Sequence, residues 1–300
     1  MIRLTLSLAA GLLLGAAAMT ASAQATNPFE LDDWKLGLPL DADGDGKSDE
    51  ISATELAEGW RDSRFFFDSG DGGISFRSPV RGTTTSSNTK YVRTELREML
   101  RRGNTRPKTS GLSKNNWNFS SAPRRSLRKL GGVDGELHAE LKIDHVTTTG
   151  DKSQIGRVII GQIHGKDDEP ARLYYRKLPG HTNGSLYFMH EVKGQEKDLL
   201  IPLLGDRANG APNPVDGIPL GERFGYSIVA MGHALQVTII RDGKPVARKQ
   251  IDMSESGYDA KDEYMYFKAG VYNQNNTGDD TDYAQATFYT LKNLHGRPPK

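Results

Sequence analysis

Two short segments combine side chains that can bind a carboxylate and move a proton. In the strand predicted over 91–99, the residues that share one face are Tyr91, Arg93, Glu95, Arg97 and Met99. A glutamate between two arginines can orient both guanidinium groups, which pair with carboxylates. In GQIHG at 161–165, Gln162 and His164 share a face while Ile163 points into the core. Taken singly, each pattern also fits an ordinary strand, as a surface row of ion pairs or a structural histidine.

A third segment, YMYFKAGVYNQ at 264–274, has one apolar and one polar face. The apolar face consists of Met265, Phe267, Ala269 and Val271, and the polar face of Tyr264, Tyr266, Lys268, Tyr272 and Gln274. A half-buried strand with a solvated face would show the same alternation. Together with the other two segments, however, it predicts a polar cleft on the face of a sheet.

The three segments resemble the signature motifs of the polysaccharide lyase family 7 alginate lyases (alginate lyase 2 superfamily). The matching stretches are RTELREM at 93–99, QIH at 162–164 and YFKAGVYNQ at 266–274, and the similarity extends over about 27–294. The resemblance implies a β-jelly roll of two curved antiparallel sheets, with the motif strands lining a concave groove. It also implies alginate as the partner and cleavage by β-elimination to 4,5-unsaturated oligosaccharides, with no metal required.

Elimination from a uronate needs donors that neutralise its carboxylate, a base for the C5 proton and an acid for the leaving 4-oxygen. The family's catalytic residues match Arg93, Gln162, His164 and Tyr272. Arg93 and Gln162 suit the carboxylate, with His164 as a further donor, whereas Tyr272 and His164 suit the proton transfers. Nearby cations are expected to favour the phenolate of Tyr272. The predicted substrate-binding residues are Glu95, Arg97, Tyr266, Lys268, Asn273 and Gln274.

Isoleucine at the centre of QIH is associated in the family with activity on guluronate-containing blocks, so Ile163 predicts that preference. Two other functions remain open at this point. A glycoside hydrolase on a similar jelly roll needs two carboxylates beside the scissile bond, and the predicted cleft strands supply only Glu95. A non-catalytic module would use the same cleft only to hold polyuronate.

The elements that must position these residues are short strands separated by Gly, Asp, Asn and Pro, with only one short helix, at 54–60. Many strands at short spacing indicate an all-β sandwich or jelly roll, expected as one domain over 24–300. The segments 103–132 and 194–221 are predicted to be long loops. The segment 97–129 contains ten Lys and Arg residues and a single acidic residue, Glu98. This basic band is expected either to attract a polyanion or simply to be solvated.

The N-terminal segment 1–23 has the pattern of a signal peptide, with a basic start, an apolar run and Ala21-Ser22-Ala23 as the cleavage motif. We therefore expect a secreted or periplasmic protein, cleaved near Ala23. The chain has no cysteine and a formal net charge of +1. We expect a monomer with neither a nucleic acid nor a membrane as its partner.

An acidic loop at 41–50 has oxygen-bearing side chains at alternating positions, which resembles the first part of a calcium loop. Its candidate ligands are Asp41, Asp43, Asp45 and Asp49. Position twelve would be Ser52 rather than the usual glutamate. A structural Ca²⁺, expected far from the chemistry, and an acidic surface turn both fit this loop.

Overall fold

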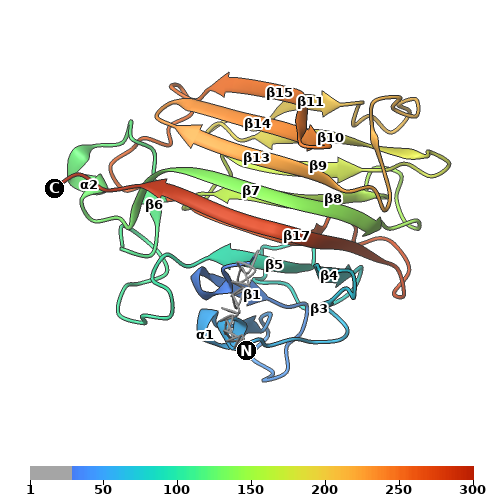
Figure 1. Cartoon of the computed structure of the whole chain (residues 1–300), viewed down its shortest axis with the longest axis horizontal. Coiled ribbons are helices and arrows are strands. Elements are labelled where there is room, and N and C mark those ends of the chain that lie inside the picture. The colour runs from blue at the N-terminus through green and yellow to red at the C-terminus, as the bar shows by residue number, and fades with distance from the viewer. Residues whose placement is uncertain (1–28) are drawn as a thin grey trace, which may run out of the picture.

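Two antiparallel sheets stack face to face in the computed structural model, which describes residues 29–300 (Figure 1). The predicted signal peptide lies outside the described residues. The first sheet, here called the groove sheet, has nine strands. Their order is β11 (Leu199–Leu204), β10 (Asn183–His190), β9 (Ala171–Arg176), β8 (Arg157–His164), β16 (Tyr266–Asn273), β5 (Arg93–Glu98), β1 (Trp34–Gly37) and β2 (Glu50–Ile51), with β12 (Ile218–Pro219) beside β10.

The second sheet, here called the outer sheet, has eight strands. Their order is β15 (Lys244–Asp252), β14 (Ala234–Arg241), β13 (Phe224–Met231), β7 (Gly132–His145), β17 (Tyr283–Gly296), β4 (Ile74–Pro79) and β3 (Phe66–Asp68). β6 (Trp117–Asn118) pairs with β7 and is parallel to it. The predicted sandwich of two antiparallel sheets is confirmed.

Helices are few and short. The described residues contain a 3₁₀ turn, η1 (Leu31–Asp33), and two α-helices, α1 (Ala53–Ala57) and α2 (Arg124–Leu127). α1 confirms the short helix predicted at 54–60, and it is preceded by the N-cap Ser52, whose side chain forms a capping box with Glu55. None of the helices in the described part of the chain is long and apolar enough to span a membrane.

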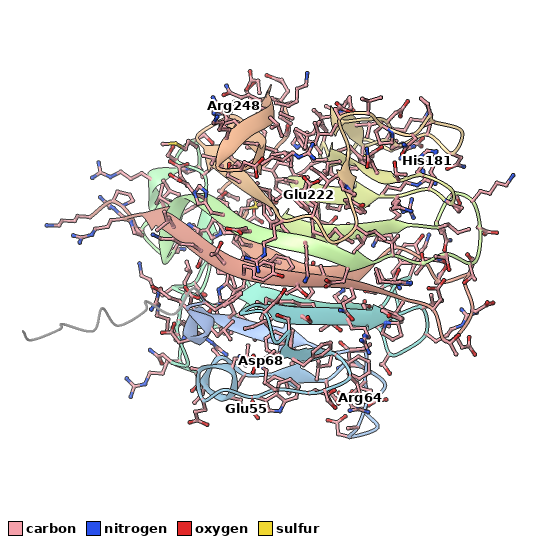
Figure 2. All side chains as sticks on the ribbon, turned by 45° about the vertical axis from the view of Figure 1, so that its right-hand side comes forward. Glu55, Arg64, Asp68, His181, Glu222 and Arg248 are labelled. Atoms are coloured by element: carbon pink, nitrogen blue, oxygen red, sulfur yellow. The ribbon has the colours of Figure 1, made fainter. Side chains whose placement is uncertain are left out.

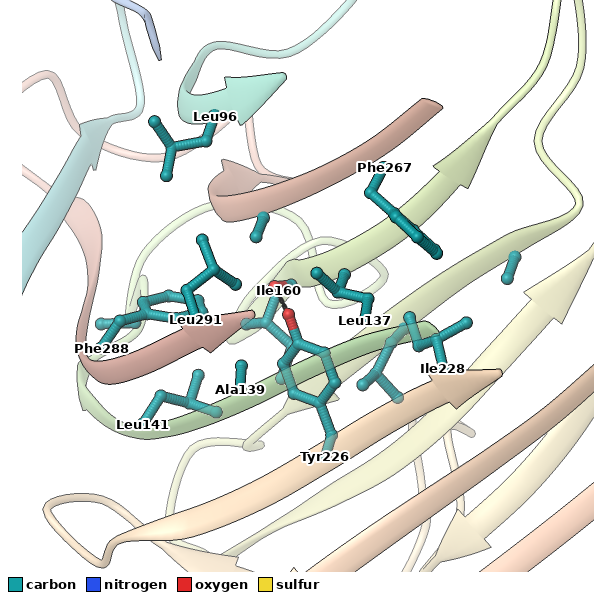
Figure 3. Packing of buried hydrophobic residues seen from close by; sticks show 14 of the residues in the cluster. Leu96, Leu137, Ala139, Leu141, Ile160, Tyr226, Ile228, Phe267, Phe288 and Leu291 are labelled. Atoms are coloured by element: carbon teal, nitrogen blue, oxygen red, sulfur yellow. Dashed lines mark hydrogen bonds between the residues drawn. The ribbon is translucent and has the colours of Figure 1, made fainter. Parts of the chain in front are cut away.

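The hydrophobic core lies between the two sheets, where alternate residues of facing strands meet. Figure 3 shows Phe267 and Leu96 of the groove sheet near Leu137 and Phe288 of the outer sheet. Tyr226 reaches across the core, and its hydroxyl donates to the carbonyl of Ile160 at 2.9 Å. Charged side chains such as those of Arg64 and Arg248 point outward instead (Figure 2).

The two predicted long loops are not structureless. Residues 103–132 contain β6 and α2, and residues 194–221 contain β11 and β12. The sequence prediction missed β1 because it alternates over only four residues, and it missed β11 because LLIPLL shows no alternation of apolar and polar residues. β1 matters for function, since it extends the groove sheet beyond β5.

Candidate active site

A groove of about 530 Å³ crosses the exposed face of the groove sheet. Its floor comes from β5, β16 and β8, the three strands that carry the sequence motifs. Of the predicted site residues, those that line it are Arg93, Glu95, Arg97, His164, Tyr266, Lys268, Tyr272 and Gln274. The three motifs, far apart in the sequence, therefore meet in one cleft, as the alternation predicted.

Strand register decides which of these side chains become neighbours. β16 lies between β5 and β8, so that Tyr272 pairs with Arg93 and Tyr266 pairs with His164. Gly270 pairs with Glu95 at a φ of +137°, and a Cβ there would lie 2.8 Å from the carbonyl oxygen of Thr94. Glycine is therefore required at 270, because a side chain there would collide with the backbone of β5 and with the core residue Phe76.

Glu95, whose side chain is inaccessible to solvent, forms the centre of an ionic cluster at the floor of the groove. Its carboxylate lies 2.6 Å from the Lys268 ammonium and 3.2 Å from the Arg93 guanidinium, and it accepts a hydrogen bond from Gln162. Burial alone would raise the pKa of Glu95, but Lys268 and Arg93 outweigh it and hold the pKa below its usual value. Glu95 therefore orients Arg93 as predicted. It does not contact Arg97; its second cation is Lys268.

Lys268 and Tyr272 both titrate away from their ordinary values. Burial, together with the neighbouring Arg93, lowers the pKa of Lys268 to about 8, although Glu95 opposes the shift. Burial also raises the pKa of Tyr272, and the Arg93 guanidinium, 3.6 Å from the ring centroid, offsets only part of this effect. The expectation that cations would favour the phenolate of Tyr272 is therefore wrong, and Tyr272 is a protonated donor in this state.

Arg97 and His164 both contact the ring of Tyr266. The Arg97 guanidinium lies 3.9 Å from the Tyr266 ring centroid, and the His164 ring stacks on the same ring at 5.0 Å. Arg97 also donates to the carbonyl of Thr109 and, at 3.1 Å, to the side chain of Asn116. Arg97 is thus held by the loop that follows β5, and Tyr266 links it to His164.

Two predicted site residues take other positions. Asn273 is fully buried on the core face of β16, where its amide donates to the carbonyls of Ser78 and Pro79. It cannot bind substrate there, so the prediction for Asn273 needs correction. Gln162 is 1% exposed and directs its amide at Glu95. It lies beneath the groove and contacts the cluster rather than the open cleft.

Three side chains that line the groove have a buried donor without a hydrogen-bond partner in the described part of the chain. The donors are the Nε of Arg93, the Nε of Arg172 and the Nε2 of Gln274. A buried donor without a partner costs free energy that a bound acceptor would return. Because Arg93 lies against Tyr272, these donors can hold an anionic ligand next to a phenol that can donate a proton.

Sequence reasoning missed other residues that line the groove. They are Lys35 on β1, Glu50 on β2, the loop residues Thr85, Ser86, Asn88, Thr89 and Lys90, and Glu169 and Arg172 near the start of β9. Glu169 lies 3.1 Å from the Nε2 of His164. No periodic pattern marks these positions, because loops and strand ends bring them to the groove.

The acidic loop brings three of its four predicted ligands together. Single carboxylate oxygens of Asp41, Asp43 and Asp49 lie within 4.8 Å of one another, whereas Asp45 bonds the backbone N–H of Lys47 instead. One oxygen of Asp41 is buried without a partner, which fits an oxygen-ligated cation. The cavity beside the loop shares Glu50 and Thr85 with the groove. The loop therefore borders the groove, and the expectation that it would lie far from the chemistry is wrong.

The basic band does not form one surface. Arg97 is a groove residue, and Arg102 pairs with Glu30, Asp32 and Asp33 near the start of the described chain. The exposed members around α2 are Arg124, Arg125, Arg128 and Lys129. Arg106, Lys108 and Lys114 are exposed in the loop before α2, so the basic residues of the band are divided among separate environments.

Comparisons with known proteins agree on one family. A family profile described as alginate lyase matches residues 29–295. An alginate lyase of Klebsiella pneumoniae is 54% identical over 276 residues, covering 89% of this chain and 90% of that protein. The crystal structure of the alginate lyase from Klebsiella pneumoniae has a TM-score of 0.88 at 52% identity and covers 90% of this chain and 98% of its own. Alginate lyase A1-II', a member of polysaccharide lyase family 7, has a TM-score of 0.64 at 26% identity, with 90% and 98% covered.

Proposed function

Because the chain belongs to the alginate lyase family, polysaccharide lyase family 7, we propose that it cleaves alginate by β-elimination. The observation that carries this proposal is the unpaired Nε of Arg93, buried in the groove beside Tyr272. A uronate carboxylate bound there would satisfy the free donor. Its negative charge would be neutralised as the C5 proton leaves, which is the condition that elimination requires.

The roles of the groove residues follow from their contacts. Arg93 receives the uronate carboxylate, and Glu95, which also pairs with Lys268, holds Arg93 in place. Tyr272, whose pKa is raised by burial, keeps its proton at neutral pH and delivers it to the leaving 4-oxygen. Gln274, Arg97 and Tyr266 contact neighbouring sugars along the groove. Gln162 donates a hydrogen bond to Glu95 and so supports the Arg93 that binds the uronate carboxylate. It can also donate to the uronate carboxylate directly if the substrate displaces its hydrogen bond to Glu95.

We further propose that guluronate-containing blocks are the preferred substrate. The support is Ile163, which is fully buried behind the groove between Gln162 and His164. Its side chain cannot touch a sugar, so any effect on preference acts through the placement of these two neighbours.

A glycoside hydrolase is a weaker explanation of the same groove. The structure adds Glu50 and Glu169 to Glu95 as groove carboxylates. A hydrolase needs one of them protonated as a general acid. The pKa values of Glu95 and Glu169 are both lowered, and Glu50 pairs with Lys35. None of the three is therefore suited to donate a proton.

One assay tests the proposal against both alternatives. Purified protein is incubated with alginate, and ultraviolet absorbance and reducing ends are followed together. Elimination creates a conjugated C4–C5 double bond and raises both signals. Reducing ends without absorbance would indicate a hydrolase, and neither signal would indicate a binding module. Rates on separated polyguluronate and polymannuronate test the preference, which faster lysis of polymannuronate would contradict.

The setting of the protein is also proposed. We infer that the segment 1–23 is removed near Ala23 and that the mature chain acts in the periplasm or the medium as a monomer. Catalysis in this proposal uses side chains alone and requires no metal. N-terminal sequencing of the exported protein, combined with its mass in solution, checks the cleavage position and the monomer.

A further inference from the structure

A cavity of about 350 Å³ adjoins the groove at the side of β1 and β2. It shares Lys35 and Glu50 with the groove, so it continues the groove past these two residues. Its other walls are Met99 at the end of β5, the start of α1 and the loop 101–109. Lys35 pairs with Arg97 in the strand register, which places the cavity on the groove face of the sheet.

Arg101 lines this cavity and has no acidic partner within residues 29–300. Its Nη1 donates to the carbonyl of Pro107 at 2.8 Å, whereas its Nε is buried without a partner. Nη2 likewise makes no hydrogen bond within the described part of the chain. Nε and one terminal nitrogen of a guanidinium form a planar edge whose two N–H groups match the two oxygens of a carboxylate. This edge of Arg101 is therefore free to bind an anion.

The charges around the cavity are unbalanced in the same sense. Glu50 is the one carboxylate among the lining residues, and it forms an ion pair with Lys35. Burial lowers the pKa of Lys35. Glu50 opposes this shift, and the nearby Arg97 and Arg101 add to it. Three cations thus surround one carboxylate, and a further anion would reduce their mutual repulsion.

We propose that the cavity is an outer subsite, which binds the carboxylate of a uronate several sugar units away from the bond that is cleaved. The inference rests on the proposed lyase function, because Arg93 marks the reacting uronate. From Arg93 to Met99 the extended backbone advances by about 20 Å, at about 3.3 Å per residue. Several sugar units are needed to span this distance. Longer chains therefore reach Arg101, and short oligosaccharides occupy the groove alone.

The neutral part of the lining suits a sugar chain. Three threonine hydroxyls, from Thr54, Thr105 and Thr109, line the cavity, and none of them has a hydrogen-bond partner within residues 29–300. They can pair with sugar hydroxyls while Arg101 holds the carboxylate. No bond is made or broken there, so the subsite contributes binding free energy alone. It should lower KM for long chains without changing the chemical step.

Arg101→Gln removes both the charge and the free edge. We expect KM for polyguluronate to rise about tenfold, the effect of one lost charge-assisted hydrogen bond, with kcat unchanged. On oligomers too short to reach the cavity, the variant should match wild type. Arg106→Gln is the matched control, because Arg106 is exposed in the same loop but does not line the cavity. It should leave KM unchanged at every chain length.

Thr105→Glu tests the subsite without altering Arg101 or its hydrogen bond to Pro107. The new carboxylate would lie in the cavity and pair with Arg101, so it should compete with the uronate and raise KM for long chains alone. Thr105→Gln has the same size without the charge and should retain the wild-type dependence on chain length. This pair keeps the proposal testable if Arg101→Gln disturbs the fold of the loop.

The closing experiment measures binding and cleavage separately. Oligoguluronates of increasing length are titrated by calorimetry into protein that carries Tyr272→Phe, and initial rates are measured on the active protein. Affinity should rise with length, and its last rise should disappear in Arg101→Gln and in Thr105→Glu. Equal losses at every length, or no loss in either variant, would overturn the proposal. Length-dependent binding without any unsaturated product from the active protein would refute the lyase function and leave the uronate subsite standing.

Discussion

Glu95 and Glu98 lie on the same strand, β5, and point to opposite faces of the groove sheet. Both carboxylates are inaccessible to solvent. Glu95 meets the Lys268 ammonium and the Arg93 guanidinium on the groove side. Glu98 lies between the sheets and accepts hydrogen bonds from Trp117, Phe267, Asn293 and His295. One residue type on one strand thus occupies two different buried polar sites.

The two buried sites differ in whether any charge or hydrogen-bond donor around the carboxylate is left without a partner. Around Glu95, two cations face one carboxylate, and the Nε of Arg93 has no partner. Around Glu98, the donors converge on the carboxylate from both sheets, and burial is opposed chiefly by His295, so that the pKa of Glu98 is lowered. A surplus of positive charge and free donors marks a site that binds an anion. A closed set of partners marks a site that only stabilises the fold.

Removing the phenol should give the largest effect on the groove side. Tyr272→Phe deletes one oxygen but keeps the ring that stacks on Arg93. We expect turnover to fall by about 10²–10⁴-fold, the usual contribution of a positioned acid or base, with folding and alginate binding retained. Turnover on both block types and a separate affinity measurement check this. Tyr283→Phe on β17, in the outer sheet, is the matched control. If Tyr272→Phe keeps more than a few per cent of turnover on either block type, Tyr272 only stacks on sugar.

The second-largest effect is expected from replacing the guanidinium of Arg93 by an ammonium. Arg93→Lys preserves the charge but loses the planar fork and the free Nε donor. We expect it to be nearly as damaging as Arg93→Ala, with turnover reduced by about 10²–10³-fold. Arg77→Lys, on β4 of the outer sheet, controls for a general effect of the exchange. Near-normal turnover of Arg93→Lys would mean that residue 93 supplies only long-range attraction.

Neutralising the two glutamates separately tests the comparison itself. Glu98→Gln breaks the bonding pattern around His295 and should lower the free energy of unfolding by about 1–3 kcal/mol while the folded protein keeps its turnover. Glu95→Gln should lower turnover instead, because Arg93 and Lys268 lose the charge that positions them. Denaturant titrations and initial rates of both variants measure the two effects. Equal losses of turnover would erase the distinction between the sites.

The pH dependence of stability sharpens the same test. Because the folded pKa of Glu98 is lowered, its contribution is present above the unfolded pKa and is lost as the pH falls through the folded value. The folded pKa of His295 is raised, chiefly by Glu98 against burial, so its contribution is present at low pH and is lost as the pH rises through that value. In Glu98→Gln, both dependences should weaken.

The sequence predicted the faces of the strands better than the contacts across them. Alternation placed Arg93, Glu95 and Lys268 on one face because period two is a local property of a strand. The same alternation places Asn273 beside Val271 on the core face. The prediction that Asn273 binds substrate did not take this alternation into account. Glu169 had no such signal, because its contact with His164 depends on how the turn after β8 folds back.

The smallest effect is expected at the acidic loop, beyond the β2 edge of the groove sheet. We propose that Asp41, Asp43 and Asp49, whose carboxylate oxygens lie within 4.8 Å of one another, hold a structural Ca²⁺. A cation that binds only the folded chain stabilises it by about 2.7 kcal/mol at one hundred times its Kd. Each kcal/mol corresponds to about 2–4 °C in Tm for a domain of this kind.

Excess chelator added to calcium-loaded protein should therefore lower Tm by several degrees and leave turnover at low temperature unchanged, because no groove residue with a proposed chemical role is a ligand. Asp43→Asn should lower the affinity for Ca²⁺ and reduce the response to chelator. Asp45→Asn, which alters a side chain outside the group of three, should preserve the response. An unchanged Tm in chelator would show that the hydrogen bonds of these carboxylates to the loop backbone, such as Asp41 to the N–H of Gly46 at 3.1 Å, are their whole role.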